Sequence, residues 1–118
     1  MPEYEIFHNP RCSKSRATLK LLQENGVEPT IRLYLENPPS AAELKRLFKM
    51  LELEPRSLIR DGEDEYRELG LVDPQLSNAK LIEAMTAHPR LIQRPIVIRD
   101  QNAAAIGRPP EAVLKLLD

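Results

Sequence analysis

The order of strand and helix patterns along the chain is the feature that most limits its fold. Short runs of alternating or β-branched residues predict four strands: 4–8, 30–35, 94–98 and 103–106. Apolar residues at helical spacing predict a helix over 13–25, helices starting at 40 and 77, and a last helix over 111–117. The chain thus begins with a strand, a helix and a strand, continues through a helical block, and ends with a hairpin and a helix. This order is typical of an α/β protein.

Proline and capping residues mark the borders between these parts. Pro38 and Pro39 interrupt the chain, and Ser40 with Glu43 has the pattern of a capping box, so a helix should begin there. With 118 residues, the chain has the length of one domain. We expect a single domain over 1–118, built from three parts: βαβ over 1–37, a helical insertion over 38–90 and ββα over 91–118.

Composition argues against several classes of protein. Hydrophobic residues make up 42% of the chain and charged residues 30%, which is typical of a globular protein and not of a disordered one. No apolar run reaches the roughly 20 residues of a membrane helix, and the first residues lack a basic and apolar signal segment. A net charge of −1 argues against a general affinity for nucleic acid. We expect a cytoplasmic monomer without membrane or nucleic-acid partners.

The chain holds a single cysteine, Cys12. One cysteine can neither form an internal disulfide nor complete a zinc site of the usual cysteine spacing, so we expect no metal. Redox chemistry at Cys12 would need a resolving thiol from another molecule. Between residues 6 and 23 the sequence has basic residues and no acidic one: Arg11, Lys14, Arg16 and Lys20.

The predicted place of Cys12, between a strand and a helix, favours a reactive thiolate. Unpaired amides and the helix dipole at a helix N-terminus stabilise an anion, and the same amides can bind an oxyanion. The alternative is an inert, buried cysteine, which is the common fate of a free thiol. A tyrosine-phosphatase loop is excluded, because an arginine would be needed where Thr18 stands. Ser15 occupies the fourth place of a Cys-x-x-Cys outline; it cannot resolve a disulfide but can donate a hydrogen bond to a thiolate.

Three arginines stand at expected loop or strand edges: Arg60, Arg94 and Arg108. Guanidinium groups supply the paired, planar donors that a tetrahedral dianion needs. Arg94 and Arg108 each precede a proline, which restricts the backbone before it, and Pro95 is a candidate for a cis peptide bond. Taken singly, each arginine is equally well interpreted as a solvated surface residue.

Four motifs together resemble the ArsC family of glutaredoxin-dependent arsenate reductases, and most closely its short bacterial branch. They are His8-Asn9-Pro10-Arg11-Cys12-Ser13-Lys14-Ser15-Arg16, Leu33-Tyr34-Leu35-Glu36-Asn37-Pro38-Pro39-Ser40, Arg94-Pro95-Ile96-Val97 and Gly107-Arg108-Pro109-Pro110. The resemblance implies a thioredoxin-like α/β fold, with a four-stranded mixed sheet and a helical insertion between the βαβ and ββα halves.

The resemblance also implies a reaction. Cys12 would attack arsenate, glutathione would attack the resulting adduct, and glutaredoxin would remove the glutathione as arsenite forms. Glutathione would be a co-substrate, and no cofactor would be tightly bound. By motif, Arg94, Arg108 and Arg60 would hold the oxyanion. His8 and Ser15 match residues that favour the thiolate, although a histidine at a strand end can also be a capping or core residue.

Two other functions stay open. A general monothiol–disulfide oxidoreductase acting on glutathionylated proteins would need Cys12 but not the arginines. An Spx-like protein-binding regulator would contact RNA polymerase, but the Cys-x-x-Cys switch of that branch is absent, since Ser15 replaces its second cysteine.

Overall fold

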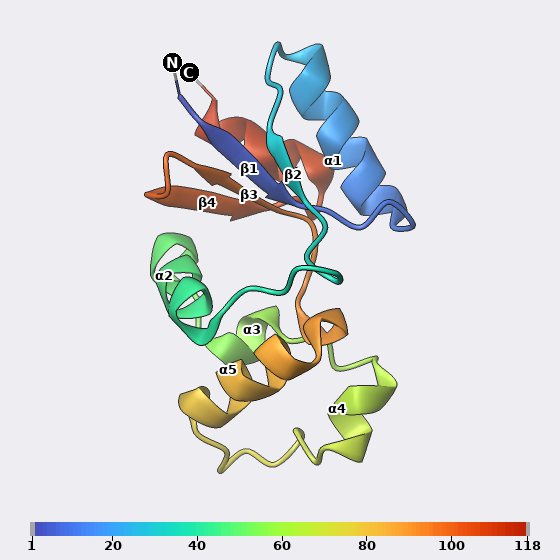
Figure 1. Ribbon diagram of the computed structural model, residues 1–118, viewed down its shortest axis with the longest axis vertical. Helices are drawn as coiled ribbons and strands as arrows, with labels where there is room; N and C mark the ends of the chain where they lie inside the picture. Colours follow the sequence, from blue (N-terminus) through green and yellow to red (C-terminus); the bar gives the residue numbers. More distant parts are fainter. Residues whose placement is uncertain (1, 118) are drawn as a thin grey trace. The chain divides into compact units, whose positions relative to one another are not determined.

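The computed structural model describes residues 2–117 and, within them, places four strands in one mixed sheet (Figure 1). The strands are β1 (Tyr4–Phe7), β2 (Thr30–Arg32), β3 (Ile96–Arg99) and β4 (Ala103–Ile106), in the order β2-β1-β3-β4. Strand β1 pairs parallel with β2 and antiparallel with β3, which pairs antiparallel with β4. This is the predicted α/β class with a mixed four-stranded sheet.

The chain divides into two compact units. The first runs up to Asn37 and resumes at Arg94, and it contains the sheet, helix α1 (Ser13–Glu24) and the 3₁₀-helix η2 (Pro110–Leu116). Its core joins one face of the sheet to these two helices through six buried apolar residues: Ile6, Leu22, Val97, Ala105, Val113 and Leu116. Fully burying one such leucine or isoleucine contributes about 1.5–3 kcal/mol. This unit carries Cys12.

The second unit, Pro38–Gln93, is helical. It contains α2 (Ala41–Leu51), α3 (Pro55–Leu58), α4 (Asp64–Glu68), α5 (Asn78–Ala87) and the 3₁₀-helix η1 (Pro89–Leu91). The predicted capping box is confirmed, because the Glu43 amide donates to Ser40 Oγ at 3.1 Å and the Ser40 amide donates to Glu43 Oε1 at 3.0 Å. Buried apolar side chains hold the helices together: Leu44, Leu47, Leu58, Leu81, Met85 and Leu91.

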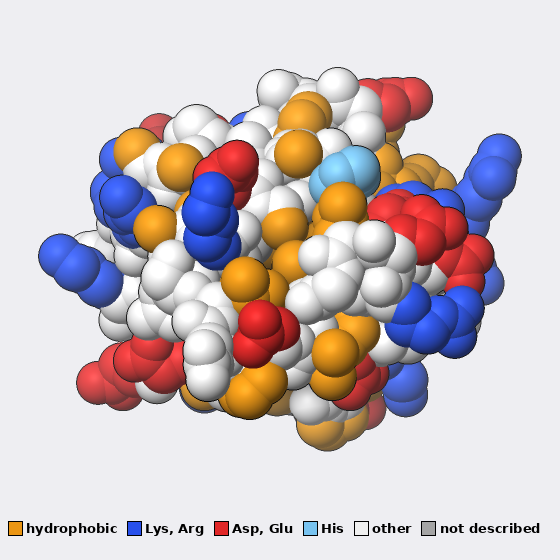
Figure 2. Space-filling model, turned by 90° about the horizontal axis from the view of Figure 1, so that it is seen from below, with side chains coloured by type: hydrophobic (Ala, Val, Ile, Leu, Met, Phe, Trp, Pro, Cys, Tyr) orange, Lys and Arg blue, Asp and Glu red, His pale blue; other side chains and the backbone are white. Residues whose placement is uncertain are grey.

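The side chains on the surface and the length and polarity of the helices bear on charge and on membrane insertion. Basic, acidic and apolar side chains are mixed on the face seen in Figure 2, in keeping with the nearly balanced net charge of −1. Within residues 2–117, every helix is too short or too polar to cross a bilayer.

Three elements differ from the prediction by two or more residues or in helix type, and the others by at most a single residue at an end. Strand β2 ends at Arg32 and not at residue 35, because the amides of Glu36 and Asn37 both donate to the Leu33 carbonyl and turn the chain. Strand β3 begins at Ile96, two residues later than predicted. The last helix is a 3₁₀-helix over Pro110–Leu116 in place of an α-helix over 111–117.

Candidate active site

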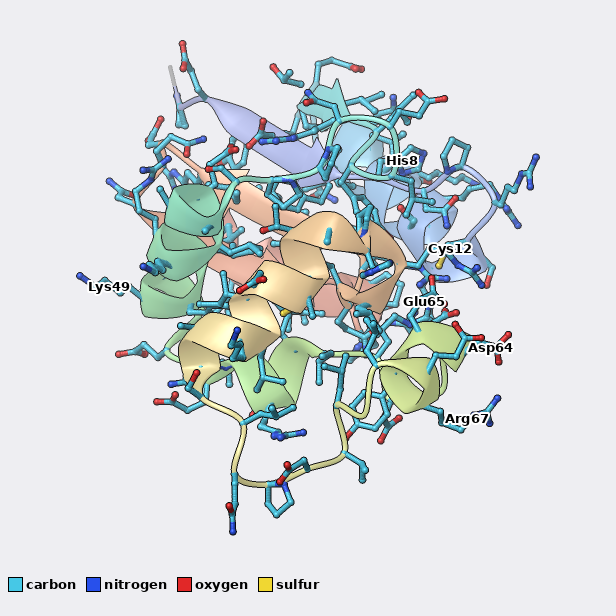
Figure 3. The ribbon with its side chains drawn as sticks, turned by 60° about the horizontal axis from the view of Figure 1, so that its bottom comes forward. His8, Cys12, Lys49, Asp64, Glu65 and Arg67 are labelled. Atoms are coloured by element: carbon cyan, nitrogen blue, oxygen red, sulfur yellow. The ribbon has the colours of Figure 1, made fainter. Side chains whose placement is uncertain are left out.

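Cys12 is the N-cap residue of α1, at the end of the loop that follows β1 (Figure 3). Its backbone is extended, with φ −92° and ψ 122°, and its amide donates to the Asn9 carbonyl at 2.9 Å. The Cys12 carbonyl accepts from the Arg16 amide at 3.0 Å, which closes the first turn of the helix. The thiol is half-buried and therefore remains accessible to a reactant.

The pKa of the Cys12 thiol is lowered from its ordinary value. Burial acts on the pKa most strongly and would raise it, but several effects together outweigh burial. In order of size, they are the backbone amide of Ser15, a hydrogen bond from the Arg94 side chain, the backbone amide of Lys14 and the positive charge of Arg94. The amides belong to the first turn of α1, so helix and arginine act on the same sulfur. The predicted reactive thiolate therefore has a local physical cause.

Arg94 and Arg108 lie at the same end of the β3–β4 hairpin. Ile96 pairs with Ile106, so the residues just before β3 and just after β4 come together. Arg108 Nη2 lies 3.9 Å from Cys12 Sγ, and Arg108 Nε donates to the Arg94 carbonyl at 2.7 Å. The peptide bonds Arg94–Pro95 and Arg108–Pro109 are both cis. Two guanidinium groups and the thiol thus share one site, and of the two arginines Arg94 is the one that lowers the pKa of the Cys12 thiol.

His8 and Ser15 form a buried pair beneath the loop. His8 Nδ1 lies 2.6 Å from Ser15 Oγ, which also accepts from the Asn9 amide at 3.0 Å. Burial first, and the charge of Arg16 second, lower the pKa of His8, which favours the neutral imidazole, and its Nδ1 shares a hydrogen bond with Ser15 Oγ. The Ser15 hydroxyl is thus used to hold the loop, and Ser15 acts on the Cys12 pKa through its backbone amide.

Arg60 lies in the helical unit, next to the isolated bridge between Ile59 and Ile92. Its Nη1 donates to Glu63 Oε1 at 2.8 Å, and the other oxygen of Glu63 accepts from Arg90 Nη2 at 3.0 Å. The acidic stretch after Arg60 thus supplies a bridging carboxylate between two arginines. The role of Arg60 as an oxyanion ligand stays a prediction.

The basic residues around Cys12 are exposed on the loop and on α1. Arg16 Nη1 donates to the Pro10 carbonyl at 2.9 Å and so braces the loop that leads to the cysteine. Within residues 2–117, no three His, Cys, Asp or Glu side chains are grouped so that they could hold a metal ion. Positive charge, helix amides and a thiol are therefore the chemical resources of this site, and together they suit attack on an anionic electrophile.

Two further residues that the sequence does not single out for the site, Thr18 and Gly107, lie close to it. Both are buried, and a Cβ atom built on Gly107 would lie 2.4 Å from Thr18 Oγ1. Thr18 was noted only as the residue that excludes a phosphatase loop. The available signal was a glycine placed directly between a strand and an Arg-Pro pair.

The chain is similar to known proteins over nearly its whole length. A model described as the ArsC family matches residues 7–116. The Escherichia coli (strain K12) protein YfgD, whose name assigns no activity, is 53% identical over 116 residues that cover 98% of this chain and 97% of that protein. An arsenate reductase of Neisseria meningitidis serogroup A is 48% identical over 118 residues, covering 99% of this chain and 100% of the relative. The solved structure of an arsenate reductase from Vibrio cholerae has a TM-score of 0.94 and 51% identity, and the match covers 98% of each chain.

Proposed function

Because the chain belongs to the ArsC family, we propose that it is an oxidoreductase that reduces arsenate to arsenite with Cys12 as its nucleophile. One observation carries the proposal: the Cys12 thiol, at the N-terminus of a helix, has a lowered pKa and lies 3.9 Å from an arginine. The names of the Neisseria meningitidis and Vibrio cholerae relatives support arsenate as the substrate.

In the first step, the Cys12 thiolate attacks the arsenic atom of arsenate. A sulfur–arsenic bond forms, one arsenic–oxygen bond breaks, and the departing oxygen leaves as water after it takes up protons. Arsenic remains in the +5 state. Arg94 and Arg108 are suited to hold the other oxygens, since their guanidinium groups lie beside the sulfur and supply paired donors.

The reduction itself needs two external thiols, since the chain has a single cysteine. The thiol of glutathione displaces a second oxygen as water and bonds to arsenic. A glutaredoxin thiolate then attacks the glutathione sulfur: a disulfide forms, the sulfur–arsenic bond breaks, and its electron pair stays on arsenic, which becomes arsenic(III). Hydrolysis of the remaining bond, between arsenic and the Cys12 sulfur, releases arsenite and the Cys12 thiol. Glutathione is thus a co-substrate and glutaredoxin a partner.

Arg60 completes the proposed site as a third oxyanion ligand, on the strength of its motif position. What supports this proposal, besides the motif, is that a guanidinium supplies paired donors for an oxyanion, as Arg60 does in donating to the Glu63 carboxylate. The enzyme is further proposed to act as a cytoplasmic monomer with no tightly bound cofactor.

The test is a coupled assay of arsenite production with glutathione and glutaredoxin present. The parent should form arsenite, and Cys12→Ser should form none, because a serine hydroxyl is not ionised near neutral pH and is a poor nucleophile there. Omitting glutaredoxin should stop turnover. A folded parent that makes no arsenite under these conditions would contradict the proposal.

A general monothiol–disulfide oxidoreductase is the second candidate, because the amides of Ser15 and Lys14 act on Cys12 without help from any arginine. Such an enzyme would exchange thiols with glutathionylated proteins and would not need Arg94 as a ligand. Replacing Arg94 by alanine separates the two functions, because arsenate reduction should fall while thiol exchange should survive.

A further inference from the structure

The two arginine-bearing segments of the site are tied to each other at the open end of the β3–β4 hairpin. The Gly107 amide donates to the Pro95 carbonyl at 2.9 Å, and Arg108 Nε donates to the Arg94 carbonyl at 2.7 Å. These bonds extend the hairpin contacts beyond the Ile96–Ile106 pair. The position of one arginine backbone therefore fixes that of the other.

Gly107 lies in direct contact with helix α1 and with Pro95. A Cβ atom built on Gly107 would lie 2.4 Å from Thr18 Oγ1, 3.1 Å from Thr18 Cγ2 and 2.7 Å from Pro95 Cγ. Real Cβ atoms do not approach so closely, so a side chain here must displace Thr18 of α1, Pro95 before β3, or both. Gly107 is buried, and the requirement for glycine comes from this close approach.

Thr18 connects this contact to the start of α1. Its side chain is fully buried, and its Oγ1 donates to the Lys14 carbonyl at 2.8 Å. Lys14 is in the first turn of the helix, and its amide helps to lower the pKa of Cys12. At a rise of about 1.5 Å per residue, Thr18 lies only about 9 Å along the helix from Cys12. Thr18 is thus bonded to the turn whose amides act on the sulfur.

We propose that Thr18 and Gly107 are positioning residues, whose contact sets the spacing between the Cys12 sulfur on α1 and the guanidinium groups of Arg94 and Arg108 on the hairpin. The inference rests on the proposed function, because it assigns both residues to the arsenate site. A methyl group at 107 widens the spacing, and loss of the Thr18 side-chain branches leaves a gap. Either change misplaces the oxyanion ligands relative to the nucleophile.

The test is Gly107→Ala, alone and combined with Thr18→Ala. The single variant should lower kcat/KM for arsenate on the order of 10–100-fold, as expected for a displacement of about 1 Å, with most of the change in KM. The pH midpoint of Cys12 alkylation should rise, because Arg94 moves away from the sulfur. The double variant removes both Thr18 atoms that the methyl meets, so it should recover part of both losses.

Gly62→Ala is the matched control, because a Cβ at Gly62 meets no atom within 4 Å. It should keep the parental KM and alkylation midpoint. A purely structural role for Gly107 would lower the melting temperature of both Gly107 variants and leave the midpoint and KM of the folded enzyme unchanged. That result would overturn the proposal.

Two further outcomes are decisive. If Gly107→Ala does not fold, Thr18→Ala is compared with Thr18→Val, which keeps the shape of the side chain. The alkylation midpoint should rise more in Thr18→Ala than in Thr18→Val, and equal midpoints would overturn the proposal. If the folded parent reduces no arsenate, the proposed function fails by itself, while the alkylation midpoint still tests whether the contact positions Arg94 against Cys12.

Discussion

Replacing Arg94 by alanine removes the one guanidinium that acts on the Cys12 thiolate by both hydrogen bond and charge. A hydrogen bond to a charged group contributes about 1.5–3 kcal/mol. Since 1.36 kcal/mol corresponds to a tenfold change in rate, kcat/KM for arsenate should fall about 10–150-fold. Arg94→Lys keeps the charge but loses the planar pair of donors, so its loss should be smaller.

Two effects of Arg94 can be separated by pH. At neutral pH the variant loses both an oxyanion ligand and part of its thiolate, because the pKa of Cys12 rises when Arg94 is removed. At a pH well above the ordinary pKa of cysteine, both enzymes carry the thiolate, and only the loss of the ligand remains. Arsenate reduction should therefore stay impaired at high pH, while exchange with a glutathionylated peptide should recover.

Arg67→Ala is the control for Arg94→Ala. Arg67 forms an exposed ion pair with Asp64, with 76% of its side chain accessible, and such pairs contribute little (Figure 3). The control should keep parental kcat/KM at both pH values. Parental arsenate reduction by Arg94→Ala would refute the assignment of Arg94 as an oxyanion ligand, and an equal defect in thiol exchange at high pH would refute the separation of its two effects.

Three further predictions concern other parts of the chain. Ser40→Ala should lower the free energy of unfolding by about 1 kcal/mol in urea titrations, because it removes the capping box of α2; an unchanged midpoint would contradict this. The pKa of His8 is lowered by burial and by Arg16, so the unfolded chain binds more protons below about pH 6.5, and stability should fall as pH decreases through that range. Thermal melts should show this slope in the parent and a flatter one in His8→Gln. Arg60→Ala should raise KM for arsenate and leave the Cys12 alkylation profile unchanged, since Arg60 is not among the groups that act on the pKa of Cys12; a shifted profile would contradict the role of Arg60 as a ligand alone.

The sequence predicted those parts of the fold that local signals determine. The capping box at Ser40 and the helix that begins after Cys12 depend on residues close together in the sequence, and the structure has both. The prediction for β2 was too long because Leu33 and Leu35 continue an alternating pattern, while backbone hydrogen bonds to the Leu33 carbonyl turn the chain there. The position of the last helix was predicted but its type was not, because a proline in the first turn is compatible with both a 3₁₀-helix and an α-helix.

The site was predictable in its residue types and not in its contacts. The basic surroundings of Cys12 indicated an anionic thiol, and the structure adds that amides of the first turn and Arg94 outweigh burial. The contact between Thr18 and Gly107 joins residues far apart in sequence, and tertiary packing alone reveals it. The Ser15 hydroxyl faces His8 because buried polar groups must be paired, and no sequence pattern states which partner each one finds.

The most direct test of the account is the rate of iodoacetamide alkylation as a function of pH, measured on the folded protein and on the same protein unfolded in guanidinium chloride. Cys12 is the sole cysteine, so the signal comes from one sulfur. We predict a lower midpoint in the folded protein than in the unfolded one, and a higher midpoint in folded Arg94→Ala than in the folded parent. A folded midpoint equal to or above the unfolded one would contradict the claim that helix amides and Arg94 hold this sulfur as an anion.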